Sequence, residues 1–264
     1  MATAPSKKRS DRMVALLELL QERGPLSLTS IADLLDASAA TIRRDVALMA
    51  SQGLIERTHG GARPLETGTE VPVHLRGGQH PAAKQAIAGV VASLIPAGQH
   101  AIGLTGGSTT DAVLRALKGH DDLTIITNSI SVGQAAAELD QSRVLIVGGV
   151  LRRNSLELIG SLAESTMKLI KVETTILGAD GCTVEGGLTT HDKREARTNQ
   201  LMAERADRVI AAVDSSKLGL QTDAKVVDLQ QVDTLVTDAG APEALLEAIR
   251  DLGVEVLVAG GATR

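Results

Sequence analysis

The 264-residue sequence contains no Phe, Tyr or Trp. An ordinary chain of this length would carry about 20 aromatic residues. We interpret their absence as the mark of a natural sequence rewritten in a reduced alphabet, which a natural source protein lacking aromatics would contradict. The core must then be built from aliphatic side chains and Met, which bury less area each. Because no base can stack on an aromatic ring, the sequence also disfavours a single-stranded nucleic-acid partner.

Cysteine and long apolar runs are scarce as well. The single cysteine, Cys182, excludes an internal disulfide and fits a reducing cytoplasm. No apolar run approaches the roughly 18 residues of a membrane span. The basic segment MATAPSKKRSDR is not followed by the apolar stretch of a secretory signal. We therefore expect a cytoplasmic protein with no membrane partner.

Charged residues of both signs are present, but they are unevenly distributed along the chain. The net charge of the whole chain is −5, which by itself disfavours a nucleic-acid partner. Residues 1–65 carry a net charge of +2 and the remainder carries −7. The sequence thus joins a slightly basic head to an acidic body.

The head has the pattern of three short helices. Apolar spacing predicts the first helix over 10–23, with Ser10 or Asp11 as its N-cap. The second covers residues 27–37, and Ser38 caps a third over 39–52. The residues expected on the buried faces of the second and third helices are Leu28, Ile31, Leu34, Leu35, Ile42, Val46 and Met49.

A short extended stretch with two glycines follows the third helix. Together these elements predict a winged helix-turn-helix domain over residues 8–65. Residues 66–80, with scattered Pro, Gly and charge, read as a loosely packed linker.

From residue 81 to residue 260 the pattern changes to short apolar strands that alternate with amphipathic helices. Such alternation predicts an α/β domain, with a mostly parallel sheet covered by helices on both faces. The predicted fold class is therefore α/β, a small winged helix-turn-helix head joined to a larger α/β domain.

The third helix and the wing are candidates for reading double-stranded DNA. The first turns of the second motif helix enter the major groove, where arginine reads guanine or clamps phosphate. Glycines in the wing allow close approach to phosphate. A plain solvated helix face is the alternative explanation of the arginine pair. Asp45 is expected to orient an arginine or cap a neighbour. The candidate DNA-binding residues are Ser38, Thr41, Arg43, Arg44, Arg57, His59 and Gly60.

The segment IGLTGGSTTDAVLRAL joins a predicted strand to a predicted helix and forms a candidate anion site. Its free backbone N–H groups, its hydroxyls and the helix N-terminus suit an anion. It has neither a P-loop lysine nor a dinucleotide fingerprint. Polar groups after other strands should lie at the same sheet edge, although each alone is more often a turn former. The candidate effector-binding residues are Gly106, Gly107, Ser108, Thr109, Thr110, Asn128, Asp180 and Lys217.

The sequence predicts no catalytic residue, no metal site and no cofactor. None of the six histidines has a carboxylate-paired metal spacing, and Cys182 has no partner at zinc-like spacing. Cys182 is either a small buried apolar residue or a redox-sensitive thiol. Asp192 and Glu195 have the spacing of a capping box.

The segment ATIRRDVALMASQGLIERTHGGA resembles the recognition helix and wing of the DeoR family of bacterial transcription regulators. The family pattern T-I-R-R-D-L stands here as Thr41 to Val46, with Val46 in place of leucine, and R-x-H-G-G-A stands as Arg57 to Ala62. The later segments GSTT, TNS, GADG, GLTTHD, EARTN and DSSKLG follow in the family's order. The resemblance covers residues 10 to 258.

This resemblance implies a sensor domain similar to ribose-5-phosphate isomerase and CoA-transferase folds. It also implies a homo-oligomer, a dimer or tetramer, that represses genes of sugar metabolism until a phosphorylated sugar releases it from operator DNA. The alternative is a sugar-phosphate isomerase-like enzyme with an appended nucleic-acid-binding head. Gly181 stands where the isomerases carry a further acidic residue, which disfavours that alternative.

Overall fold

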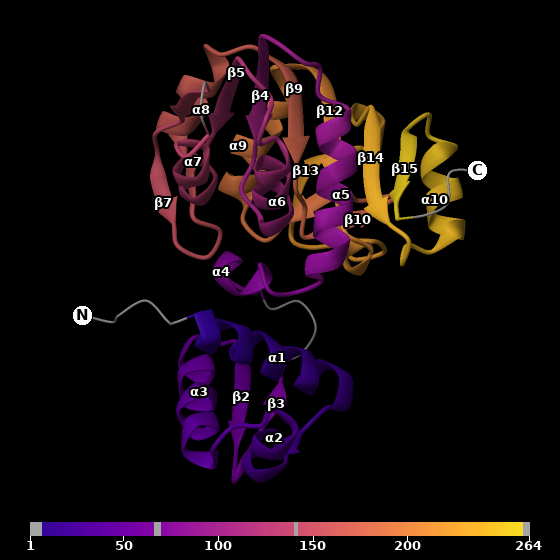
Figure 1. Ribbon diagram of the computed structural model, residues 1–264. Coiled ribbons are helices and arrows are strands. Elements are labelled where there is room, and N and C mark those ends of the chain that lie inside the picture. The colour runs from indigo at the N-terminus through magenta and orange to yellow at the C-terminus, as the bar shows by residue number, and fades with distance from the viewer. Residues whose placement is uncertain (1–6, 66–69, 140–141, 261–264) are drawn as a thin grey trace. The chain divides into compact units, whose positions relative to one another are not determined.

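The computed structural model describes residues 7–65, 70–139 and 142–260 (Figure 1). The chain divides into two compact units, residues 1–79 and 80–264. The first carries the predicted helix-turn-helix pattern and the second the predicted alternation of strands and helices. The α/β fold class predicted from the sequence is confirmed.

The N-terminal unit packs helices against a small antiparallel sheet. In chain order it contains α1 (Lys7–Arg23), β1 (Leu26–Ser27), α2 (Leu28–Leu34), α3 (Ala39–Ser51), β2 (Ile55–Thr58), β3 (Gly61–Pro64) and α4 (Val73–Arg76). The three strands lie in the order β1-β3-β2, so the β2–β3 hairpin forms the wing.

Apolar periodicity explains most of this unit, with two differences. Helix α1 begins at Lys7 rather than at residue 10, so neither Ser10 nor Asp11 is its N-cap. The prediction that Leu34 faces the core was wrong, because its side chain is 46% exposed at the end of α2. Only Ile31 and Ala32 of α2 are buried. Leu28 and Leu35, which flank this stretch, are partly buried against the same core.

Part of the segment expected to be a loosely packed linker contributes to the N-terminal core. Residues 66–69 lie outside the described residues. Beyond them, helix α4 packs on α1, and Leu75 belongs to the same buried apolar cluster as Leu16 and Met49. A short helix with two buried side chains, Val73 and Leu75, was hidden in the sequence by its proline and glycine neighbours.

The second unit is built on a seven-stranded parallel sheet. Its strand order is β15-β14-β12-β9-β4-β5-β6, and every neighbouring pair is parallel. All carboxyl ends therefore lie at one edge, to which the arrowheads point in Figure 1. The strands are β4 (His100–Leu104), β5 (Leu123–Thr127), β6 (Arg143–Ile146), β9 (Val172–Leu177), β12 (Ala206–Ala212), β14 (Thr234–Asp238) and β15 (Glu255–Ala259).

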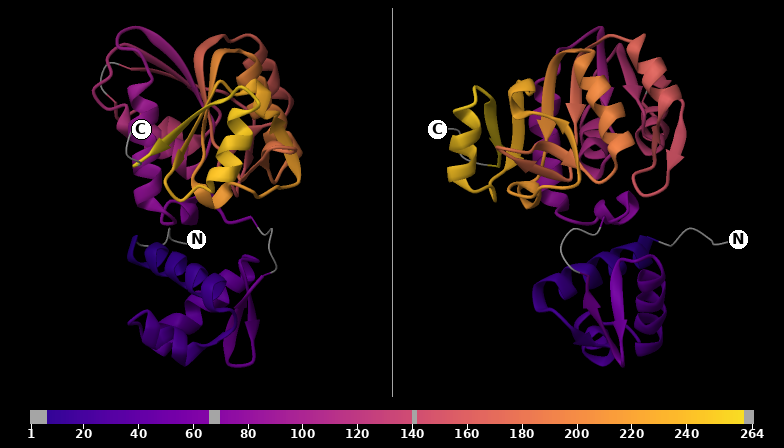
Figure 2. Two further views of the ribbon diagram at one scale, coloured as in Figure 1. Left: turned by 90° about the vertical axis from the view of Figure 1, so that its right-hand side faces the viewer. Right: turned by 180° about the vertical axis from the view of Figure 1, so that it is seen from behind.

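Helices cover both faces of this sheet, as the alternating pattern predicts. The apolar sides of α5 (Pro81–Ser93), α6 (Ser108–Ala116) and α7 (Ile130–Ala136) share one buried cluster with the strands. Helices α8 (Ser161–Lys168), α9 (Lys193–Glu204) and α10 (Glu243–Arg250) pack on the other face. Figure 2 shows the two sides of this layered arrangement.

Two small antiparallel sheets were not predicted from the sequence. The first is the hairpin of β7 (Val150–Arg152) and β8 (Glu157–Ile159). The second joins β10 (Gly181–Thr183), β11 (Gly187–Thr190) and β13 (Ala224–Val227). Their strands of three or four residues are too short for period-two alternation to be recognised. The first hairpin carries side chains to the carboxyl edge of the main sheet.

Candidate functional site

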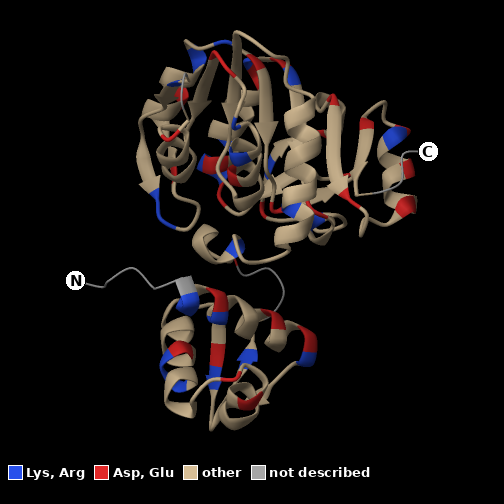
Figure 3. Ribbon diagram, in the orientation of Figure 1, with Lys and Arg blue, Asp and Glu red and all other residues tan. Residues whose placement is uncertain are grey.

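Helix α3 presents its two arginines on the side opposite its buried face. Ile42, Asp45, Val46 and Met49 are buried at helical spacing. The exposed stripe on the other side consists of Ala40, Arg43, Arg44 and Ala47. In this stripe the two arginines are flanked by alanines, whose side chains are small. Figure 3 shows the basic and acidic positions along α3.

Ser38 and Thr41 begin this helix. Ser38 has extended backbone, and its hydroxyl accepts the N–H of Thr41 at 3.2 Å, as the predicted N-cap should. The two hydroxyls also lie 2.8 Å apart. Ser38 is exposed and Thr41 partly so. Both side chains therefore have a structural role in the first turn and stand next to the exposed stripe.

Asp45 anchors α3 to α1. Its carboxylate is 2% exposed and accepts hydrogen bonds from Arg9 Nε at 3.1 Å and Arg12 Nε at 2.7 Å. The expectation that Asp45 orients an arginine is confirmed, but the arginines belong to α1, not to α3. Arg43 and Arg44 are therefore left to the solvent-facing stripe.

The wing places its remaining candidate residues in an exposed position. Arg57 lies on β2, and the tight turn between β2 and β3 consists of His59 and Gly60. All three are exposed. Gly60 has a φ of +87°, which favours glycine, and its carbonyl accepts the N–H of Leu28 at 2.9 Å. The turn is therefore fixed to the start of α2.

The loop after β4 contains the five residues predicted for an anion site. Gly106 and Gly107 lead into α6, whose N-cap, Gly107, has a φ of +136° and offers no side-chain cap. The hydroxyl of Thr110 is buried and donates to the Gly107 carbonyl at 2.8 Å. Thr109 is also buried, whereas Ser108 is partly exposed. Thr110 thus shapes the loop, and we use the word cradle for the backbone N–H groups at this helix start.

The structure brings Asn128 to this loop through a residue that the sequence did not single out. Glu157 Oε1 accepts the Gly106 N–H at 2.7 Å, and Glu157 Oε2 lies 3.3 Å from Asn128 Nδ2. Asn199 Nδ2 also donates to Glu157 Oε2, at 3.2 Å, and Asn128 Nδ2 donates to Asn199 Oδ1 at 3.0 Å. Asn128 follows β5, Glu157 begins β8 and Asn199 lies on α9. Three elements distant in sequence therefore meet at one carboxylate.

Asp180 joins the same region through α9. The Thr190 hydroxyl lies 3.0 Å from Asp180 Oδ2 and 2.5 Å from Glu195 Oε1. The Thr190 hydroxyl thus links the two carboxyl groups. On the other side of Glu195, Arg152 donates to its Oε2 at 3.1 Å. Asp180, Glu157 and Glu195 together form what we call the acid cluster.

Burial governs the titration of this cluster. The pKa of Glu157 is raised well above its ordinary value by burial and by the neighbouring charge of Glu195. Burial also raises the pKa of Glu195, while the hydrogen bond from Thr190 and the charge of Arg152 lower it in part. The folded protein therefore holds protons here that free carboxyl groups would release.

Lys217 lies farther along the same sheet edge. It belongs to the 3-10 helix η1 (Ser215–Lys217) that follows β12, and β9 separates β12 from β4. Two strand spacings correspond to about 10 Å. Asp214 accepts hydrogen bonds from the backbone and side chain of Ser216 and so caps η1. Lys217 thus follows a strand two positions away from β4 at the same end of the sheet, and Asp214 has a local role as the cap of η1.

Cys182 is a core residue. It is fully buried in an apolar cluster with Leu188 and Val227. Burial raises the pKa of its thiol to about 12. Of the two alternatives for this residue, the structure supports the small apolar one.

Sequence reasoning missed Arg152, Glu157, Glu195 and Asn199 as parts of this region. Asp192 does cap α9, accepting the N–H groups of Arg194 and Glu195. The Glu195 side chain instead points to Arg152 and Thr190, so the predicted capping box is only half formed. The acidic residue amid apolar neighbours in SLELIG was the available signal for Glu157.

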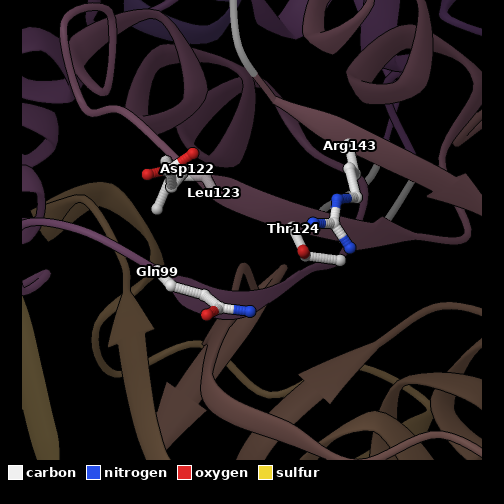
Figure 4. Close-up of a pocket in the computed structure, with 5 residues that line it drawn as sticks. All are labelled: Gln99, Asp122, Leu123, Thr124 and Arg143. Carbon is white, nitrogen blue, oxygen red and sulfur yellow. The ribbon is translucent and has the colours of Figure 1, made fainter.

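A separate cavity lies at the opposite edge of the sheet. It has a volume of about 160 Å³ and is lined by Gln99, Asp122, Leu123, Thr124 and Arg143, at the amino ends of β4, β5 and β6 (Figure 4). It contains none of the predicted site residues.

Among the described residues, no three His, Cys, Asp or Glu side chains are arranged to hold a metal ion. No helix within residues 7–65, 70–139 and 142–260 is long and apolar enough to cross a membrane.

Comparison with known families matches both units. The profile of the DeoR-like helix-turn-helix domain matches residues 12–67, and the profile of the DeoR C terminal sensor domain matches residues 79–239. The first match contains α3 and the wing. The second contains the Gly106–Thr110 loop and the acid cluster.

Individual relatives align over nearly the whole chain. The chain is 34% identical to the HTH-type transcriptional regulator GlpR of Haloferax volcanii, over 94% of this chain and 97% of that protein. It is 30% identical to the glycerol-3-phosphate regulon repressor of Escherichia coli K12, over 94% and 98%. It is 32% identical to the transcriptional repressor CsqR of the same organism, over 92% and 93%.

Among solved structures, ribose 5-phosphate isomerase A of Methanocaldococcus jannaschii matches with a TM-score of 0.40 at 18% identity, over 53% of this chain and 55% of that chain.

Proposed function

Because the chain belongs to the DeoR family of transcription regulators, we propose that it represses genes of sugar metabolism and is released from its operator by a phosphorylated sugar. The observation that carries the DNA-binding half of the proposal is the exposed stripe of α3. Asp45 is occupied by Arg9 and Arg12, so Arg43 and Arg44 remain available to bases and phosphates. Arg57 and His59 on the wing extend this surface. Ser38, Thr41 and Gly60 position it.

The effector half of the proposal rests on the Gly106–Thr110 loop and its surroundings. The loop offers backbone donors at the start of a helix, which suits a phosphate. Asn128, Asp180 and the residues of the acid cluster offer acceptors and donors for sugar hydroxyls. Lys217, on the same sheet edge, is proposed to add a positive charge. The relatives named for glycerol-3-phosphate regulation support an effector of this class.

We propose that the site binds its effector without converting it. Raised pKa values at Glu157 and Glu195 would suit proton transfer in a sugar-phosphate isomerase. However, Glu157 is held by Gly106 and two asparagines, and Glu195 by Arg152, so both carboxylates are engaged within the protein. Incubation with ribose 5-phosphate should leave the sugar unchanged. Formation of the ketose isomer would support the enzyme alternative.

The proposal includes a homo-oligomer acting on operator DNA in the cytoplasm. Large apolar side chains are exposed on the edge strand β6 and on β7: Leu145, Ile146, Val150 and Leu151. An exposed apolar strand at a sheet edge is normally covered by a partner. In a symmetric dimer, two helix-turn-helix units read half-sites one helical turn apart or a multiple of it.

The test begins with selection of duplexes that the full chain binds from a random DNA pool. The enriched sequence should contain two related half-sites. Arg43→Ala/Arg44→Ala should then weaken binding at least about tenfold, because each lost arginine contact to a base or phosphate costs about 1–3 kcal/mol. It should also lower the salt dependence of binding. Fluorescence anisotropy with labelled DNA measures both.

The matched control is Lys118→Ala/Lys168→Ala, which removes two exposed cations from the second unit. It should bind DNA like the unmodified protein. Equal affinities for the arginine double variant and this control would refute the assignment of α3 as the DNA-reading helix.

A further inference from the structure

Glu157 is an acidic residue of the protein itself whose carboxyl group lies in the cradle proposed for the anion of the effector. Its carboxylate accepts the Gly106 N–H at 2.7 Å, directly before the amino end of α6. Two side-chain amides, Asn128 and Asn199, donate to its other oxygen. A backbone amide at a helix start together with side-chain amide donors is a set that would equally hold a phosphate oxygen.

The backbone of β8 fixes this carboxylate in place. The Leu158 N–H donates to the Asn128 carbonyl at 2.7 Å, and the Ile130 N–H donates to the Leu156 carbonyl at 3.0 Å. Leu156 takes a φ of +58°, a backbone conformation that costs energy in a non-glycine residue. A Cβ on Gly106 would collide with the Glu157 side chain. The Glu157–Gly106 contact therefore depends on the backbone pairing of residues 156–158 with residues 128–130 and on glycine at position 106.

The charged groups around Glu157 make this an unfavourable place for a carboxylate. Glu195 on α9 and Asp180 after β9 both disfavour its ionisation. Arg152, its cross-strand partner on β7, directs its guanidinium to Glu195 and Asp192. Glu157 is only 1% exposed, so water does not compensate. The amide donors of the cradle are therefore what favours its charged form.

An unsatisfied polar atom lies at the same place. Asn128 is fully buried, and its Oδ1 atom has no hydrogen-bond partner among the described residues. Its Nδ2 atom contacts Glu157 and Asn199, so the amide lies beside the acid cluster. A buried acceptor without a donor costs about 1–3 kcal/mol. A ligand hydroxyl would supply that donor.

We propose that Glu157 occupies the effector's anion position in the unliganded protein, and that an anionic effector binds the Gly106 amide only when Glu157 is displaced or neutralised. This proposal rests on the proposed effector site. Two anions cannot share one N–H donor without strong repulsion. Ligand binding is therefore coupled to uptake of a proton or to loss of the Glu157–Gly106 contact. The contact in the unliganded protein lowers the affinity of the site for every anion, so weakly binding anions are excluded.

Inorganic sulfate is the probe for this proposal because its charge does not change between pH 5.5 and 7.5. Calorimetric titration of the full chain with sulfate measures affinity at both pH values. Repetition in two buffers of different ionisation enthalpy measures proton uptake. The test variant is Glu157→Gln, which keeps an acceptor for Gly106 and removes the charge. Glu185→Gln, at an exposed acid in the β10–β11 turn, is the matched control.

We expect Glu157→Gln to bind sulfate at least tenfold more tightly than the unmodified chain at pH 7.5, with little change at pH 5.5. The unmodified chain and Glu185→Gln should bind more tightly at pH 5.5 and take up protons. The Gly106 amide resonance should shift on sulfate addition, which places the ion. The proton uptake of the unmodified chain tests the proposal even if Glu157→Gln folds poorly.

Other outcomes separate this proposal from the proposed effector site. Sulfate that shifts the Gly106 resonance with equal, pH-independent affinity in all three proteins would overturn the role of Glu157 and leave the anion site standing. Weaker binding by Glu157→Gln would make Glu157 a structural support and would also overturn the proposal. Failure of sulfate to bind any of the proteins would contradict the anion site itself.

Discussion

Single buried carboxylates decide the chemistry of both regions. Asp45 binds Arg9 and Arg12 of α1 and so leaves Arg43 and Arg44 on the exposed side of α3, and the Glu157 carboxyl lies in the cradle beside Gly106. The two differ in their partners. Asp45 accepts from two guanidinium groups, whereas Glu157 accepts from amide groups and lies near two acids. We therefore expect ionised Glu157 to lower the free energy of unfolding and ionised Asp45 to raise it.

The raised pKa of Glu157 gives folding stability a pH dependence of definite sign. Below its ordinary pKa of about 4.5 the carboxyl is protonated in both states. Above it the unfolded chain releases the proton and the folded protein retains it, so the free energy of unfolding falls as pH rises. Glu157→Gln should reduce this fall between pH 5 and pH 7 by about 1 kcal/mol or more.

Urea denaturation followed by far-ultraviolet circular dichroism at pH 5, 6 and 7 measures this difference. Asp192 and Asp238 have lowered pKa values, so their contribution is lost only as pH falls below about 4 and stays constant in this window. Glu185→Gln should behave like the unmodified chain. Parallel pH profiles for Glu157→Gln and the unmodified chain would show that Glu157 is not held at a cost.

The residues that sequence could identify are those whose signal is local. Ser38 precedes its helix, Gly107 precedes α6, and the pair Arg43–Arg44 lies within one turn. Glu157 and Asn199 are 42 residues apart and meet only because β8 and α9 converge. Glu195 was assigned to a capping box by its spacing, and a long-range partner, Arg152, took its side chain instead. Without contacts across the fold, no spacing rule reveals such a cluster.

At the scale of elements, the apolar periods placed the helices and the parallel strands, while short hairpins escaped detection. The β7–β8 hairpin shows why this matters, because it brings both Arg152 and Glu157 to the acid cluster. In the N-terminal unit the comparable connection is the one between α1 and α3. It passes through Asp45, which has a buried position in an otherwise apolar helix face.

Asp45→Asn should loosen α3 from α1. The substitution removes a charge that accepts two hydrogen bonds from partly exposed arginines, so we expect a loss of about 2 kcal/mol in the free energy of unfolding of the N-terminal unit. Amide hydrogen exchange in the full chain reports that unit separately, and protection in α3 should fall. Asp11→Asn, at an exposed acid of α1, is the control. Equal protection in both variants would show that Asp45 does not tie the helices together.

At the scale of the whole molecule, two sites on two separately folded units must influence one another. An effector changes DNA affinity only if it binds one state of the protein better than the other. Coupling energies of this kind are about 1–3 kcal/mol, which corresponds to a change in affinity of about 5- to 150-fold. By reciprocity, operator DNA should weaken effector binding by the same factor. We propose the replacement of Glu157 at Gly106 as a local event for this coupling.

The most direct test of the account is the affinity of the full chain for its selected operator, measured by anisotropy with and without sugar phosphates. Glycerol 3-phosphate and ribose 5-phosphate would be compared with glycerol and ribose at the same concentration. The account predicts that a phosphorylated compound lowers DNA affinity at least about fivefold while its parent has no effect. Unchanged DNA affinity across a broad panel of sugar phosphates, with operator binding intact, would contradict the claim that this chain is a sugar-phosphate-controlled repressor.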